Sequence, residues 1–292
     1  MTEVPNGPAE IFGHAVENKS AEAQSDREEY RCPYLGERCW KQSRSLDVPF
    51  GICSVWYQNE ITATCPTRFL DKQRIFEDVA DLYFGSFDNL LLFSEIGTRA
   101  EAESGNSVTY TFDYVIVKHR PLSAEIVDFV IVEFQTVDTT NTGGLVDAFR
   151  AYQSGHNTLT ERWNFGMNWK NVWKRCFTQI LQKGLVMEKW GHKIFWVAQP
   201  TSYRRLADGY GLYGLEYDAA DSTGFLLYEH EKSGEDYLLK LARKTSASAD
   251  ELFRAFQEST PIPQKSFFLE RLSEKVSAKE MRLELGLQHG EE

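Results

Sequence analysis

The middle of the chain contains short, nearly continuous apolar runs that predict buried β-strands. Such runs are typical of strands covered on both faces, because a strand with one wet face alternates between apolar and polar residues. The sequence between 104 and 106 reads Ser-Gly-Asn and predicts a turn. The predicted central strands are 90–93, 108–117, 126–134 and 193–198, and weaker patterns indicate strands at 225–228 and 237–241.

Segments in which apolar residues recur with helical spacing lie between these runs and on either side of them. The first predicted helix covers residues 69–84 and ends at Gly85. The order of helices and strands predicts an α/β fold, with a mixed central sheet and flanking helices. The other predicted helices are 145–152, 169–181, 251–256 and 269–285.

The N-terminal quarter has a different pattern. Residues 1–30 are acidic and have few large apolar side chains, so a flexible arm is expected. Residues 31–66 contain four of the five cysteines among prolines and glycines. A segment this short cannot form a hydrophobic core large enough to fold alone, so we expect a module that is stabilised by a bound metal ion. Residues 67–292 are expected to form the main domain.

Charge is distributed unevenly over the 292 residues, whose net charge is −11. The stretch 162–205 contains nine Lys and Arg residues and one acid, Glu188. A basic stretch in an acidic chain is typical of a face that binds a polyanion, although it also fits a solvated face without a partner. No apolar run approaches the ~20 residues of a membrane span. No secretory signal is visible, so we expect a cytoplasmic protein without a membrane partner.

Two carboxylates and an amide form the strongest chemical pattern. Asp113 lies in the strand TFDYVIV, and Glu133 and Gln135 alternate at the end of VIVEFQ. If the two strands pair, both carboxylates meet at one end of the sheet, where their oxygens could hold Mg²⁺. A metal there would activate water toward a phosphodiester. Alternatively, both acids lie at strand ends and reach solvent.

The residue at position 135 departs from the usual nuclease motif, which reads Asp followed by Asp/Glu-x-Lys. Gln135 cannot carry a positive charge, but its amide can orient an attacking water through hydrogen bonds. Glu95 follows the strand LLLF and is either a further acid at the metal or a surface acid.

The clustered cysteines form a second pattern, with the spacing C-x6-C-x13-C-x11-C. Four thiolates suit a tetrahedral zinc or iron site, although the spacing lacks the two tight CxxC pairs of a common zinc ribbon. The alternative is four buried, unligated thiols. The isolated Cys176 lies on an apolar helix face and is expected in the core. The four clustered residues are Cys32, Cys39, Cys53 and Cys65.

Together these segments resemble the NotI-type restriction endonucleases. The similar segments occur in the same order along the chain, and the resemblance fades after about residue 215. They are EIFGHAV, CPYL, GIC, TCP, FDYVIV, VIVEFQTVD, NVWKRCFTQILQKGLV and FWVAQPTSYRRL.

The resemblance implies a PD-(D/E)xK nuclease core in residues 67–292 and a homodimer that acts on a palindromic site. It implies that Asp113 and Glu133 hold Mg²⁺, that Gln135 replaces the motif Lys, and that Glu95 is a further catalytic acid. It also implies an iron site at the four clustered cysteines.

The function expected from the sequence is Mg²⁺-dependent cleavage of double-stranded DNA at a specific, palindromic and GC-rich site by a prokaryotic type II restriction endonuclease. A cognate DNA methyltransferase is expected in the same genome. The alternatives are a non-catalytic, metal-containing DNA-binding protein and a repair or transposon nuclease with the same core. Base readers are expected at Arg44, Gln199 and Arg204. The expected DNA contacts are Lys170, Lys174, Arg175 and Arg204.

Overall fold

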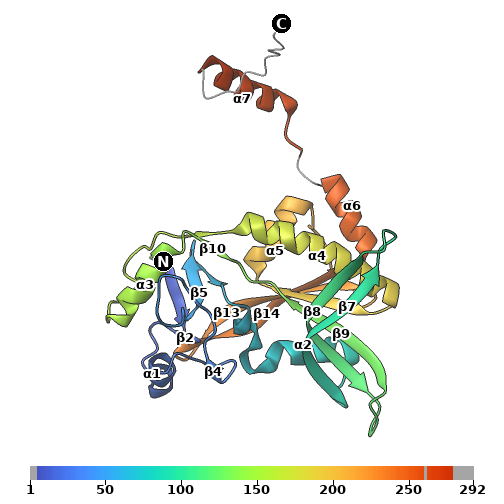
Figure 1. The fold of residues 1–292 in the computed structure, drawn as a ribbon, viewed down its shortest axis with the longest axis horizontal. Coiled ribbons are helices and arrows are strands. Elements are labelled where there is room, and N and C mark those ends of the chain that lie inside the picture. The colour runs from blue at the N-terminus through green and yellow to red at the C-terminus, as the bar shows by residue number, and fades with distance from the viewer. Residues whose placement is uncertain (1–4, 260–261, 279–292) are drawn as a thin grey trace, which may run out of the picture.

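A six-stranded mixed sheet forms the centre of the computed structural model, which describes residues 5–259 and 262–278 (Figure 1). The strand order is β14-β13-β12-β9-β8-β7. β12 pairs in parallel with β9 and β13, whereas the other neighbours pair antiparallel. The predicted α/β fold with a mixed central sheet is therefore confirmed. The strands are β7 (Leu90–Glu101), β8 (Ser107–His119), β9 (Ile126–Phe134), β12 (Lys193–Ala198), β13 (Thr223–Ser233) and β14 (Asp236–Ala247).

Helices α4 (Trp169–Trp190), α5 (Pro200–Tyr210) and α6 (Ala249–Ser259) cover one face of the sheet. Ile180 of α4 packs in one core with Trp196 of β12 and Phe225 of β13. Cys176 belongs to the same core, as predicted. α5 is not predicted by the apolar pattern, although Pro200 in its first turn marks where it starts.

The opposite face is covered by η1 (Pro66–Gln73) and α2 (Arg74–Phe84). Their apolar side chains pack on β9, where Phe76 stacks on Phe134. The single helix predicted over 69–84 is wrong in one respect, because the chain kinks at Asp71 and Lys72, near the end of η1. Lys72 has a φ of 52° there, so the two helical segments do not form one helix. The predicted end at Gly85 is confirmed by its φ of 64°.

A second sheet, with strand order β2-β1-β5-β6, is formed by strands of the N-terminal region. Helix α3 (Gly143–Gln153) packs on it, and Phe149 shares a core with Ile11 and Ile52. α1 (Ala21–Glu28) follows β2 along the chain. The strands of this sheet are β1 (Gly7–Ile11), β2 (His14–Ala15), β5 (Ile52–Tyr57) and β6 (Glu60–Ala63).

The structure of residues 5–30 differs from the flexible arm expected over 1–30, because β1 is fully buried and pairs with β5. Residues 1–4 lie outside the described residues. Buried polar contacts hold the segment in place. The Glu10 carboxylate lies 2.9 Å from the Arg68 guanidinium, and His14 lies between Asp26 and Asp236 at 2.9 and 3.0 Å. Since β1 and β5 share a sheet, no structural break separates 1–30 from 31–66.

The remaining elements are short or peripheral. α7 (Lys265–Ser277) stands apart from the body of the molecule in Figure 1 and has no buried residue. The helix predicted over 269–285 therefore begins earlier, and its part beyond 278 lies outside the described residues. None of the helices in the described ranges combines the length and the apolar character needed to span a bilayer. The short strands are β3 (Arg31–Cys32), β4 (Glu37–Arg38), β10 (Thr139–Thr140) and β11 (Gly166–Met167).

Candidate active site

Asp113 and Glu133 lie opposite each other where the pairing between β8 and β9 ends. The last paired residues are Tyr114 and Val132, and the next positions on the two strands are the two acids. Each acid also bonds the other strand's backbone. Asp113 Oδ2 accepts the Phe134 N–H at 3.0 Å, and Glu133 Oε1 accepts the Asp113 N–H at 3.3 Å. The structure thus brings together the two carboxylates singled out from the sequence.

Glu133 is buried and has a cationic partner that sequence reasoning did not find. Its Oε2 accepts a 2.7 Å hydrogen bond from the Lys183 ammonium on α4. Burial raises the pKa of Glu133 to about 7, and the nearby Asp113 raises it too, while Lys183 opposes both effects. Position 183 lies three residues after Ile180 and four before Met187, both fully buried. This spacing, which puts Lys183 on the buried helix face, could have identified it.

Gln135 follows β9 directly, two residues beyond Glu133. Its backbone N–H donates to the Val197 carbonyl at 2.8 Å, which continues the bonding between β9 and β12 past the last paired residues. The residue is partly exposed, in contrast to the buried Glu133. Gln135 is therefore the first residue after β9, at the same end of the strand as the two carboxylates.

Glu95 lies opposite Asp113 on the neighbouring strand, between the pairs Ser94–Tyr114 and Ile96–Phe112. Its φ of 55° is rare for a non-glycine residue inside a strand, and such strained positions concentrate at functional sites. Glu95 and Asp113 line the same cavity of about 330 Å³. The structure therefore places the expected third acid beside the pair.

The cysteine-containing segment forms another wall of this cavity, through Leu35 and Trp40. A charge on Cys65 would raise the pKa of Cys32, Cys39 and Cys53, although burial is the larger cause at each. Within the described ranges, no group of three or more His, Cys, Asp or Glu side chains is arranged to hold a metal ion as it stands.

The basic stretch 162–205 divides into buried and exposed residues. Lys183 and Lys193 are buried, and Lys193 donates to the carbonyls of Asp218 and Ala219 at 3.1 Å. The expected DNA contacts are all exposed. Arg175 and Arg204 have only loose acidic partners, at 3.7 and 3.8 Å. The exposed residues at these expected positions are Lys170, Lys174, Arg175 and Arg204.

The expectation that Gln199 reads bases is wrong. Its side chain is buried, with Oε1 accepting the Ala63 N–H at 2.6 Å and Nε2 donating to the Ile61 carbonyl at 2.8 Å. Both ends of the amide are thus used to hold β6 beside α5. Arg44 is exposed and stays a prediction.

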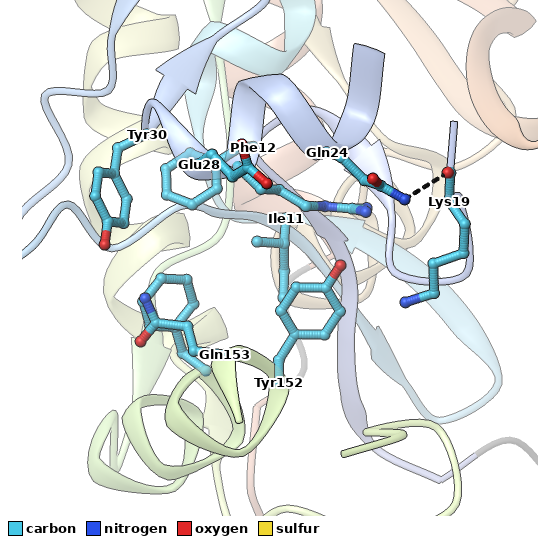
Figure 2. Close-up of a pocket in the computed structure, with 10 residues that line it drawn as sticks. Ile11, Phe12, Lys19, Gln24, Glu28, Tyr30, Tyr152 and Gln153 are labelled. Carbon is cyan, nitrogen blue, oxygen red and sulfur yellow. Dashed lines mark hydrogen bonds between the residues drawn. The ribbon is translucent and has the colours of Figure 1, made fainter. Parts of the chain in front are cut away.

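A separate cavity of about 370 Å³ lies between α1 and α3 (Figure 2). Lys19 and Arg27 lie over the Tyr152 ring at 5.5 and 5.3 Å, and Arg27 also donates to two backbone carbonyls. None of the four predicted catalytic residues lines this cavity. The cavity beside Asp113 and Glu95 is therefore the better candidate for the active site.

The comparison with protein families identifies the family of the chain. The family model described as restriction endonuclease NotI matches residues 10–208, more than half of the chain. The matched region includes all four predicted catalytic residues, the four clustered cysteines and Lys183. No curated protein matches the chain. The chain therefore belongs to the NotI restriction endonuclease family and is a site-specific deoxyribonuclease whose substrate is double-stranded DNA.

Proposed function

We propose that this restriction endonuclease hydrolyses phosphodiester bonds with Mg²⁺ held by Asp113 and Glu133, in a core of the PD-(D/E)xK type. The observation that carries the proposal is the register of β8 and β9, which sets the two acids opposite each other at the end of their pairing. Glu95 adds a further acid to the cavity that Asp113 lines. Carboxylate oxygens are the ligands that Mg²⁺ prefers.

The residues of the site have different roles in the proposed reaction. When bound, Mg²⁺ supplies a Lewis acid that activates water and stabilises the leaving 3′ oxygen. Asp113 and Glu133 are held by backbone hydrogen bonds, so their oxygens need little reorganisation. Gln135 is neutral and positions the attacking water by hydrogen bonding. Glu95 provides a further oxygen ligand or proton acceptor within the cavity.

Cleavage of a plasmid tests this function. The purified protein is expected to linearise or fragment supercoiled DNA with Mg²⁺ and to leave it intact with EDTA. Metal-independent cleavage, or a protein that only binds DNA, would overturn the proposal. The second outcome would support the alternative of a non-catalytic DNA-binding protein.

We propose that the four clustered cysteines hold a structural iron or zinc ion. Four thiolates are a donor set that suits either ion, and Cys53 Sγ accepts the Gly13 N–H at 3.3 Å. Within the described residues the side chains are not arranged to hold the ion as they stand. Since Leu35 and Trp40 line the candidate catalytic cavity, a metal in this segment would fix one wall of that cavity. Metal analysis of the purified protein would distinguish iron from zinc.

The exposed cations of α4 are proposed to contact DNA phosphates. Replacing Lys170 and Lys174 together by Gln should weaken binding similarly on all sequences. Each lost phosphate contact lowers the slope of log K against log salt by about 1, so the double variant should lose about 2. Titrations in Ca²⁺ at several salt concentrations measure the slope. Lys240→Gln, at an exposed position on β14, is the control, and an unchanged slope for the double variant would exclude α4 from the DNA interface.

We propose that the enzyme acts as a homodimer on a palindromic, GC-rich site, because two-fold symmetry presents one active site to each DNA strand. Exposed apolar side chains on α7 support a protein contact there, with Phe268 63% and Leu272 43% exposed. A prokaryotic host with a cognate DNA methyltransferase gene would favour this restriction role over a repair or transposon nuclease, since the host's own sites need protection.

A further inference from the structure

Lys183 is buried, whereas most lysines in folded proteins are exposed to solvent. Its side chain is 9% exposed, and its ammonium lies 5.4 Å from the centre of the Phe112 ring and 5.8 Å from that of Trp196. A buried charge is costly unless it is paired, and the carboxylate of Glu133 is its partner at 2.7 Å. The pair therefore joins α4 directly to one of the two central acids.

The Glu133 carboxylate is fixed from both sides. Oε2 is bonded to Lys183, while Oε1 lies on the side of Asp113, whose backbone N–H it accepts at 3.3 Å. A carboxylate with two different partners cannot rotate freely, so its orientation is set before any metal arrives. In the usual nuclease motif, a lysine two residues after the acid provides a positive charge, and here that position holds the neutral Gln135.

Building on the proposed function, we propose that Lys183 is a positioning residue for cleavage. It holds the Glu133 carboxylate in its metal-ligating orientation and brings, from α4, the positive charge that position 135 lacks. Partners that orient a metal ligand in this way typically change metal affinity or activity by about 10- to 100-fold. A purely structural ion pair would instead contribute to stability and leave the metal affinity of the folded protein unchanged.

Lys193 offers a matched control. It is also a buried lysine, 3% exposed, and its ammonium lies 5.4 Å from the centre of the Phe195 ring and 4.9 Å from that of Tyr217. It bonds backbone carbonyls and no carboxylate of the candidate site. Replacing either lysine by Met removes a buried ammonium and keeps an unbranched side chain, so the two variants differ mainly in which partner is lost.

The experiment compares Lys183→Met, Lys183→Arg and Lys193→Met. It measures Mn²⁺ binding by electron paramagnetic resonance, DNA affinity in Ca²⁺, kcat at saturating DNA, and thermal unfolding. Lys183→Met is expected to weaken Mn²⁺ binding about 10-fold or more and to lower kcat about 100-fold, with DNA affinity nearly unchanged. Lys183→Arg should recover part of both losses. Lys193→Met should lower the unfolding temperature without changing Mn²⁺ affinity or kcat.

Normal Mn²⁺ affinity and kcat in Lys183→Met would overturn the inference, as would equal losses in Lys193→Met. If Lys183→Met does not fold, Lys183→Gln retains a hydrogen-bond donor without the charge and is measured in the same way. Asp113→Asn, assayed in parallel, separates the two proposals. An active Asp113→Asn would reject the proposed function, whereas an inactive Asp113→Asn beside a fully active Lys183→Met would reject only the role of Lys183.

Discussion

Replacing Asp113 by Asn is expected to reduce cleavage severely while leaving DNA binding largely intact. The amide oxygen of Asn can still accept the Phe134 N–H that Asp113 Oδ2 now accepts at 3.0 Å, so the end of the β8–β9 pairing should survive. The variant loses the negative charge that attracts a divalent cation. Because the variant loses one group that stabilises charge in the transition state, we expect a loss in kcat on the order of 10³-fold.

Cleavage and binding are measured separately for this variant, with Mg²⁺ for turnover and Ca²⁺ for affinity. DNA affinity should stay within a few fold of the wild-type value or rise, since a negative charge near the phosphates is gone. Glu101→Gln, which removes an exposed carboxylate at the end of β7, is the control and should cleave normally. Normal turnover by Asp113→Asn would exclude Asp113 as a ligand of the catalytic metal.

Replacing Arg68 by Met is expected to destabilise the fold strongly. Arg68 and Glu10 are both 0% exposed, and the guanidinium also donates to the Tyr237 carbonyl at 2.7 Å. It thereby ties β1 to η1 and to β14. Removing one partner leaves the other charge buried and uncompensated, which costs about 3–5 kcal/mol. Urea denaturation measures the loss in the free energy of unfolding.

An exposed pair provides the comparison for Arg68. Arg120 and Glu125 lie 3.3 Å apart at the surface, and Arg120→Met should cost no more than about 1 kcal/mol. Equal effects of the two substitutions would show that the buried pair does not hold the N-terminal segment in place.

The buried pair also predicts how stability depends on pH. Burial alone would raise the pKa of Glu10, but Arg68 and His230 lower it to about 2. A carboxylate whose folded-state pKa is depressed contributes stability above its unfolded pKa, about 4.3, and that contribution is lost as the pH falls toward about 2. The difference in unfolding free energy between wild type and Arg68→Met should therefore shrink over this range.

Elements whose position depends on the local pattern of apolar and polar residues could be predicted from the sequence. The run KIFWVA predicts β12 with its correct bounds, because a strand covered on both faces must be apolar throughout. The alternation of Glu133 and Gln135 likewise marks the end of a buried strand. The register that sets Asp113 opposite Glu133 is a property of two strands and could only be assumed.

Long-range polar contacts explain what sequence reasoning missed. Residues 7–15 have the composition of an arm, but their partners Arg68 and Asp236 lie far along the chain. Lys183 is one of the nine cations of the stretch 162–205, and lysines are usually exposed, but its burial depends on a carboxylate fifty positions earlier. In both cases the contact that decides the structure joins residues that no local window contains.

Digestion of a bacterial genome with the purified protein, followed by sequencing of the fragment ends, tests the central claim most directly. With Mg²⁺, the ends are expected to share one palindromic sequence cut at symmetric positions in both strands, and EDTA or Asp113→Asn should leave the genome intact. Ends without a common sequence, or fragments that form equally well with Asp113→Asn, would contradict a site-specific endonuclease built on Asp113 and Glu133.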